Sequence, residues 1–388
     1  MNALDLAAAV PDPRVFPVRA ADPADAVLHR LAEESLGAPT RLESDALDAA
    51  LRRALAERLA GEGPPVAQLV EAAPSVAVAR HLARLLDRVC AEPAGEGTLT
   101  VSVFALPLVL VAGIAATHGK ATLPGVLDDV GALAALLRGH GALAGNQSIA
   151  LANALVGTDA LDLPRLPELM AWQRLPDASS TALPARVVVP RPLSFAAGAE
   201  SVHLRFLLGT ALARPGAALF AARATDPWGM PLAQELARQL AVPTVSILAL
   251  PRPPRRPLAA VEDGRDAQRE VSAQLFASNA IRKFRASVGE PSAVISSHRA
   301  PAAPGMGELR VSLSSPFETR DAEGFRCPLF ATDRVGDVAA QLVRLLQDCR
   351  VADIRLLDGV HPDRVAGTTH PLLYKPETVP AGAELRRH

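Results

Sequence analysis

Aromatic residues, cysteines and catalytic motifs are all scarce in this sequence. Phe, Trp and Tyr together make up 3% of the 388 residues, so the core must be built mainly from Ala, Leu and Val. The three cysteines, Cys90, Cys327 and Cys349, are odd in number and far apart. That pattern argues against a disulfide framework and against a zinc site of closely spaced thiolates. We expect the cysteines to be small buried hydrophobic residues.

The local signatures of the common enzyme classes are missing. The sequence has no dinucleotide-binding GxGxxG, no P-loop, no HExxH, no GxSxG and no EF-hand loop. Many active sites have no local signature, so this leaves open whether the chain is an enzyme. The sequence predicts no catalytic residue, no metal ligand and no cofactor. The formal net charge of −1 provides no general attraction to nucleic acid or to an anionic membrane.

Residues 98–117 carry no charge and are long enough for a membrane helix. However, Thr98, Thr100 and Ser102 alternate with apolar residues, which is the period of a strand. The N-terminal MNALDLAAAVPDP also lacks the basic region of a signal peptide. We therefore expect a soluble cytoplasmic protein with no membrane association, and the Arg-, Ala- and Pro-rich composition favours a bacterial source.

One eight-residue phrase occurs twice: TVSVFALP starts at residue 100 and TVSILALP at residue 244. Further identities continue at the same offset of 144 residues, among them Gly145 with Gly289 and Ser148 with Ser292. Each copy predicts an apolar strand that ends at its proline, followed by a helix and a second strand. This pattern indicates an internal duplication.

The predicted fold class is therefore α/β (α+β), with two duplicated α/β modules that resemble ferredoxin-like plaits and a helical N-terminal segment. Helices are expected at about 123–138 and 266–288, and Ser44 and Asp333 are expected to cap two others. The predicted parts are a helical segment at 1–75, a first module at 75–190, a connecting insert at 191–230, a second module at 230–360 and a tail at 361–388.

The segment DIRLLDGVHPDRVAGTTHPLLYKP at 353–376 resembles the end of an uncharacterised proteobacterial family described only as a domain of unknown function. FALPLVLVAG and HLRFLLGTALARPGAALF are similar to further segments of that family. Members carry a CxxC pair in the tail, where this chain has Ala366 and Thr369. The family lends no activity, so the resemblance implies the architecture alone.

Two clusters are candidate ligand-binding residues. The first lies in the tail, after the last predicted strand, where α/β folds often place ligands; it comprises Asp358, His361, His370 and Tyr374. The second follows a strand in SSHRAP and comprises His298 and Arg299. Both clusters can also be ordinary polar residues of solvated loops.

Three functions stay open. The duplicated core without a reactive cluster favours a non-catalytic binding or scaffold protein that contacts a protein partner, a second copy of itself or a small ligand. The first alternative is an enzyme of unknown class in a cleft between the modules, using His298, His361 and His370. The second is a nucleic-acid-associated protein, because residues 252–285 are rich in Arg. Nucleic acid is the least favoured partner, since the predicted strands lack aromatics on which bases stack.

Overall fold

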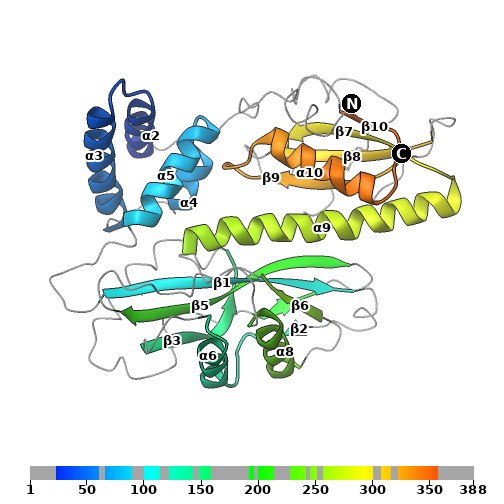
Figure 1. The fold of residues 1–388 in the computed structure, drawn as a ribbon, viewed down its shortest axis with the longest axis horizontal. Coiled ribbons are helices and arrows are strands. Elements are labelled where there is room, and N and C mark those ends of the chain that lie inside the picture. Colours follow the sequence, from blue (N-terminus) through cyan, green and yellow to red (C-terminus); the bar gives the residue numbers. More distant parts are fainter. Residues whose placement is uncertain are drawn as a thin grey trace. The chain divides into compact units, whose positions relative to one another are not determined.

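In the computed structural model the described residues are 23–60, 66–89, 100–113, 122–142, 148–158, 192–195, 200–213, 228–241, 245–250, 257–299, 307–315 and 322–356. They form an α+β fold with a helical N-terminal segment and two four-stranded sheets (Figure 1). This confirms the predicted fold class. Among these residues, no helix combines the length and the apolarity needed to cross a membrane.

The helices are α2 (Pro23–Leu36), α3 (Arg41–Ala60), α4 (Val66–Glu71), α5 (Val76–Val89), α6 (Val130–Gly139), α8 (Gly229–Leu240), α9 (Pro257–Ser287) and α10 (Val335–Asp348). The strands are β1 (Thr100–Ala112), β2 (Thr122–Leu123), β3 (Ser148–Val156), β4 (Leu193–Ser194), β5 (Ser201–Ala213), β6 (Val245–Ala249), β7 (Ser292–Arg299), β8 (Gly307–Ser314), β9 (Ala322–Leu329) and β10 (Ile354–Leu356).

The chain packs into two compact units. Unit 1 comprises Met1–Leu47, Gln68–Leu82 and Arg269–His388, and unit 2 comprises Asp48–Ala67 and Ala83–Gln268. The module boundaries predicted from the sequence stay a prediction, as does the duplication. In unit 1, His29 on α2 and the carbonyl oxygen of Leu69 on α4 are 2.8 Å apart, which ties these two helices together.

The sheet of unit 2 has the strand order β3-β5-β1-β6. β5 pairs antiparallel with β1 over its whole length, from Ser201 opposite Ala112 to Ala213 opposite Thr100. The segment predicted to be a connecting insert therefore supplies an inner strand of this sheet. Helices α6 and α8 cover one face (Figure 1). The core on that face includes Phe104, Leu106, Leu108 and Leu110 of β1, Leu133 and Leu137 of α6, and Leu232 and Leu236 of α8.

The two copies of the repeated phrase lie in neighbouring strands of this one sheet. β6 pairs antiparallel with β1, with Ala249 opposite Leu108 and Val245 opposite Ala112. The strand expected to open the second module thus lies beside β1. β1 also runs through Pro107, contrary to the expectation that this proline ends the strand. Pro107 is tolerated because β6 stops one residue away, so at that point β1 has only the partner β5 among the described strands.

The first turns of α9 belong to unit 2 and pack against the other face of its sheet. A Cβ added to Gly264 would lie 2.8 Å from Leu204 Cδ1 and 3.0 Å from Pro107 Cβ. The missing side chain therefore permits this close approach of helix and sheet. The side-chain amide of Gln268 donates a hydrogen bond of 2.9 Å to the carbonyl of Val202 on β5.

The sheet of unit 1 has the order β10-β7-β8-β9, in which β10 is parallel to β7 and the other pairs are antiparallel. Along the chain its elements follow in the order α9, β7, β8, β9, α10 and β10. One face of β8 packs against α9 and α10 (Figure 1). This core includes Leu309, Val311 and Leu313 of β8, Ala277 and Phe284 of α9, and Val338, Leu342 and Leu346 of α10.

Four predicted helix starts were wrong. α9 begins at Pro257, well before the expected start near residue 266. α3 begins at Arg41, where Thr40 Oγ1 accepts the Glu43 N–H at 3.3 Å, so Ser44 is not its cap. α6 begins only at Val130, because the Asp129 carboxylate caps it. Asp333 does not cap α10; its carboxylate instead accepts the Phe330 N–H at 2.6 Å and pairs with Arg269 of α9. Short Asp side chains often bond nearby backbone in turns.

Candidate functional site

The residues singled out from the sequence are only partly within the described chain. Asp358, His361, His370 and Tyr374 lie outside it. His298 and Arg299 form the end of β7, where their Cα atoms lie opposite Glu308 and Gly307 of β8. Their candidate roles stay predictions.

A buried ion-pair network lies on β8 and β9, on the side of the sheet opposite to α9 and α10. The Glu308 carboxylate accepts a hydrogen bond of 2.7 Å from Arg310 Nε, and its second oxygen lies 3.8 Å from Arg326 Nη1. Arg310 is directly opposite Arg326 in the register. Like charges in that arrangement repel, so the shared carboxylate stabilises the pair.

Serine residues surround this network. Ser296 lies opposite Arg310, and Ser312 and Ser314 follow along β8 on the same side. Glu308 is 3% exposed and Ser312 is fully buried. A charged group this deep needs its partner, because an unpaired buried charge is strongly destabilising. We therefore infer that this network stabilises the unit 1 sheet and does not form a ligand site.

A more accessible polar group lies in unit 2, at the start of β5. Ser201, His203 and Arg205, which we name the β5 row, alternate with apolar residues, so all three side chains share one face. In the register they lie opposite Ala112, Leu110 and Leu108 of β1. They thus continue the face that α6 and α8 cover, at its margin, and each is half-buried.

The geometry of the β5 row brings two of its side chains into contact. His203 Nε2 lies 3.0 Å from Ser201 Oγ, a hydrogen-bond distance. The ring of Phe195, which follows β4, meets the imidazole edge-on, with ring centroids 5.2 Å apart and an interplanar angle of 77°. This aromatic contact holds the imidazole in one orientation.

The environment keeps His203 neutral. Burial lowers the pKa of its imidazole below the ordinary value of 6.5, and the positive charge of Arg205 lowers it further. A neutral imidazole has one donor and one acceptor nitrogen. A negative charge close to the imidazole would act in the opposite direction and raise this pKa.

The β5 row lies where β5 extends past its neighbour. β3 pairs with β5 only from Phe206 onward, so within the described residues the stretch 201–205 has β1 as its single strand partner. Side chains cover the carbonyls there: Gln268 donates to Val202 and Arg205 Nη1 donates to Leu204, each at 2.9 Å. Covering a strand edge in this way protects it from pairing with other chains.

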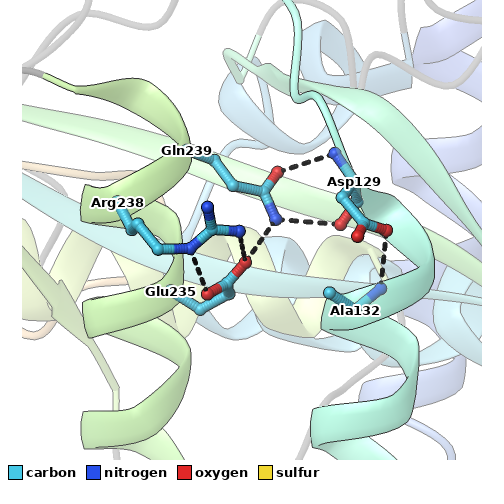
Figure 2. A network of polar contacts seen from close by, with 5 residues as sticks. All are labelled: Asp129, Ala132, Glu235, Arg238 and Gln239. Atoms are coloured by element: carbon cyan, nitrogen blue, oxygen red, sulfur yellow. Dashed lines mark hydrogen bonds and ion pairs between the residues drawn. The ribbon is translucent and has the colours of Figure 1, made fainter.

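Helices α6 and α8 are joined by a separate polar network (Figure 2). The Gln239 side chain bonds both backbone groups of Asp129: Oε1 accepts its N–H at 3.1 Å, and Nε2 donates to its carbonyl at 2.8 Å. Nε2 also donates to Glu235, whose carboxylate accepts two bonds from Arg238. These hydrogen bonds lower the pKa of Glu235 to about 2. Gln239 thereby joins α8 to the start of α6.

Of the two described cysteines, Cys327 is buried, as expected, and Cys349 is half-buried. Burial raises the pKa of the Cys327 thiol to about 12, so the reactive thiolate is scarce at neutral pH. No three His, Cys, Asp or Glu side chains there are grouped so that they could hold a metal ion.

Sequence reasoning missed the β5 row. The signal was present as strict alternation in SVHLRF, which places Ser, His and Arg on one face of a strand. The sequence instead predicts a connecting insert at 191–230, and its candidate ligand-binding residues follow other predicted strands.

Comparisons of the chain with protein-family models, with curated proteins and with solved structures found no match in any of the three. The resemblance of residues 353–376 to an uncharacterised proteobacterial family stays a prediction.

Proposed function

We propose that this chain is a non-catalytic binding protein that takes a small ligand at the β5 row. The observation that carries the proposal is the placement of Ser201, His203 and Arg205 as a half-buried polar strip beside an apolar core. Ligand sites commonly combine an apolar wall with a few fixed polar groups. The other polar networks described above are committed to helix and sheet packing.

A thermal-shift screen tests this function. A ligand that binds only the folded state raises its stability in proportion to the logarithm of ligand concentration. We expect one class in a panel of small anions, cations, sugars, nucleosides and apolar amines to raise the unfolding midpoint of the full chain. If millimolar concentrations of every class leave the midpoint unchanged, small-ligand binding is contradicted.

An enzyme remains the second candidate, because Ser201 and His203 lie 3.0 Å apart as a hydroxyl and a neutral base. Nucleophilic catalysis also needs a group that orients the imidazole and donors for the oxyanion. An activity-based fluorophosphonate probe would label the Ser201 hydroxyl if the pair is active. We expect the probe not to label Ser201. Labelling of the wild-type protein that is lost in the Ser201→Ala variant would favour the enzyme.

The proposal also covers the protein's location in the cell and its partners. We place the protein in the bacterial cytoplasm, and we keep a protein partner or a homodimer as additional contacts of a scaffold. Nucleic acid stays the least favoured partner. Retention on heparin that falls steeply with salt concentration would support it, and elution at low salt would remove it.

A further inference from the structure

We propose that the outer edge of β6 pairs with β6 of a second copy of this chain, so that two unit 2 sheets join into one antiparallel sheet. This inference goes beyond the proposed small-ligand site and does not depend on it. A strand at the edge of a sheet presents a row of backbone N–H and C=O groups that is a template for pairing with another chain. The main-chain hydrogen bonds of such an added strand supply much of the affinity.

β6 forms one end of the unit 2 sheet, whose strand order is β3-β5-β1-β6. Within the described residues its strand partner is β1, and the register between the two strands is unbroken from Val245 to Ala249. Val245, Ile247 and Ala249 pack with the core under α6 and α8. Because side chains alternate along a strand, Leu248 lies on the other face, where it is 43% exposed.

Helix α8 continues this apolar surface on its own face of the sheet. α6 packs on β3 and α8 packs on β6, and Gln239 of α8 bonds towards α6. A helix turns by about 100° per residue, so Ala237, Ala233 and Met230 lie on the side of α8 that faces away from α6, above the edge of β6. Met230 is 71% exposed. Exposed apolar side chains therefore flank the edge of β6 on both faces of the sheet.

The other edge strands carry features that prevent pairing, and β6 lacks them. The register of β3 shifts between Leu151 and Leu155, and β10 has only three residues, with the exposed ion pair of Arg355 beside it. β9 contains Arg326 and Pro328. Irregular register, short length, charge and proline are the devices by which natural sheets protect their edges. β6, with the sequence VSILA, has no charge, no proline and no shift of register.

A second copy is the partner that fits this surface. β6 and the adjacent side of α8 carry no charge, so two copies meet there without the repulsion of like charges. Two identical antiparallel strands are related by a two-fold axis, which makes the interface self-complementary and closed. An axis perpendicular to the sheet also keeps both copies of α8 on one face, with their alanine sides together. The pairing thus buries Leu248 and Met230 of both copies.

The test is sedimentation equilibrium of the full chain from about 1 to 100 μM, a range that includes the dissociation constants of small transient interfaces. We expect a reversible equilibrium between monomer and dimer, with slower amide hydrogen exchange in residues 245–249 as the concentration rises. A monomer throughout this range overturns the proposal. Slow exchange of these amides in such a monomer would assign the β6 edge to a segment of the same chain instead.

Substitutions at Leu248 localise the interface. Leu248→Lys should weaken the dimer by about tenfold or more, because it brings like charges together across the two-fold axis. Leu42→Lys is the matched control: Leu42 is an 81% exposed leucine on α3, and its substitution should leave the dimer intact. Leu248→Glu should also weaken the dimer, whereas an equal mixture of Leu248→Lys and Leu248→Glu chains should regain it.

A further variant covers the case in which Leu248→Lys does not fold. Met230→Lys makes the corresponding change on α8 and should weaken the dimer in the same way. A dimer that neither Leu248→Lys nor Met230→Lys weakens must form through another surface, and that result overturns the proposal.

Discussion

Phe104 and Gly209 lie opposite each other in β1 and β5 and show how a single residue shapes the core of unit 2. A Cβ built on Gly209 would lie 2.3 Å from Phe104 Cζ and 2.8 Å from Leu151 Cδ2. The glycine is thus required for the space that the aromatic ring fills. In a sequence so poor in aromatics, this fully buried ring is one of the largest contributors to the core.

Gly209→Ala should destabilise unit 2 because the new methyl group overlaps the Phe104 ring. Overpacking of this kind costs about 1–3 kcal/mol, measured as a lower denaturation midpoint in urea. Gly139→Ala on α6 is the matched control, since no atom lies within 4 Å of its added Cβ. That control should be neutral or stabilising, by up to about 1 kcal/mol. Equal effects of the two substitutions would refute the close contact.

At the scale of elements, Gln239 acts as a connector between helices. Its amide bonds both backbone groups of Asp129, and the Asp129 carboxylate caps α6 by accepting the Ala132 N–H at 2.8 Å (Figure 2). One side chain of α8 therefore fixes where α6 begins. This explains why α6 starts at Val130 instead of at the predicted residue 123.

Gln239→Ala should cost about 1–3 kcal/mol of unfolding free energy, since it leaves backbone groups of Asp129 without their partners. Arg238→Ala, one residue earlier, removes an exposed ion pair with Glu235 and should cost less than about 1 kcal/mol. Chemical denaturation of both variants checks the difference. A larger loss for Arg238→Ala than for Gln239→Ala is the contrary result.

Glu235 predicts a dependence of stability on pH. Its pKa in the folded state is about 2, below the ordinary value of 4.5, so the unfolded state binds more protons between these pH values. The stabilisation is therefore complete above about pH 4.5 and is lost as the pH falls towards 2. Glu235→Gln should flatten this part of the stability profile in denaturation experiments at pH 2–6. An unchanged slope would contradict the assigned hydrogen bonds.

The stability of the unit 1 sheet depends on the buried carboxylate of Glu308, which pairs with Arg310. Glu308→Ala leaves Arg310 buried without its carboxylate, which typically costs about 3–5 kcal/mol. Asp353→Ala removes the exposed partner of Arg355 and should cost less than about 1 kcal/mol. Thermal unfolding followed by circular dichroism distinguishes them. A mild effect of Glu308→Ala would mean that the arginines have other sufficient partners.

At the scale of the whole molecule, local sequence patterns predicted the helices and strands better than they predicted which strands pair with each other. The alternation of Thr100 and Ser102 with apolar residues predicts a strand, the pattern at 266–288 predicts a helix, and both elements are present as β1 and α9. The pairing of β6 with β1 was missed, because strand pairing is decided by contacts between residues far apart in the chain. For the same reason β5 was assigned to an insert although it occupies the middle of the sheet.

The candidate site, too, could be predicted from the sequence only where it depends on a local pattern. The alternation that creates the β5 row is local and could have been found. Its value as a site depends on where β3 stops pairing and on where Phe195 meets His203, and neither feature has a local sequence signal. The histidines predicted from the sequence rest on residue type and on their place after predicted strands.

Native mass spectrometry of the gently purified protein, run beside the Arg205→Met variant, tests the central claim most directly. The proposed function predicts that wild type carries an additional small mass, lost on mild activation, and that the variant does not retain it. A wild-type protein with no bound mass, even after incubation with millimolar concentrations of every class in the thermal-shift panel, would contradict a small-ligand binding protein built around the β5 row.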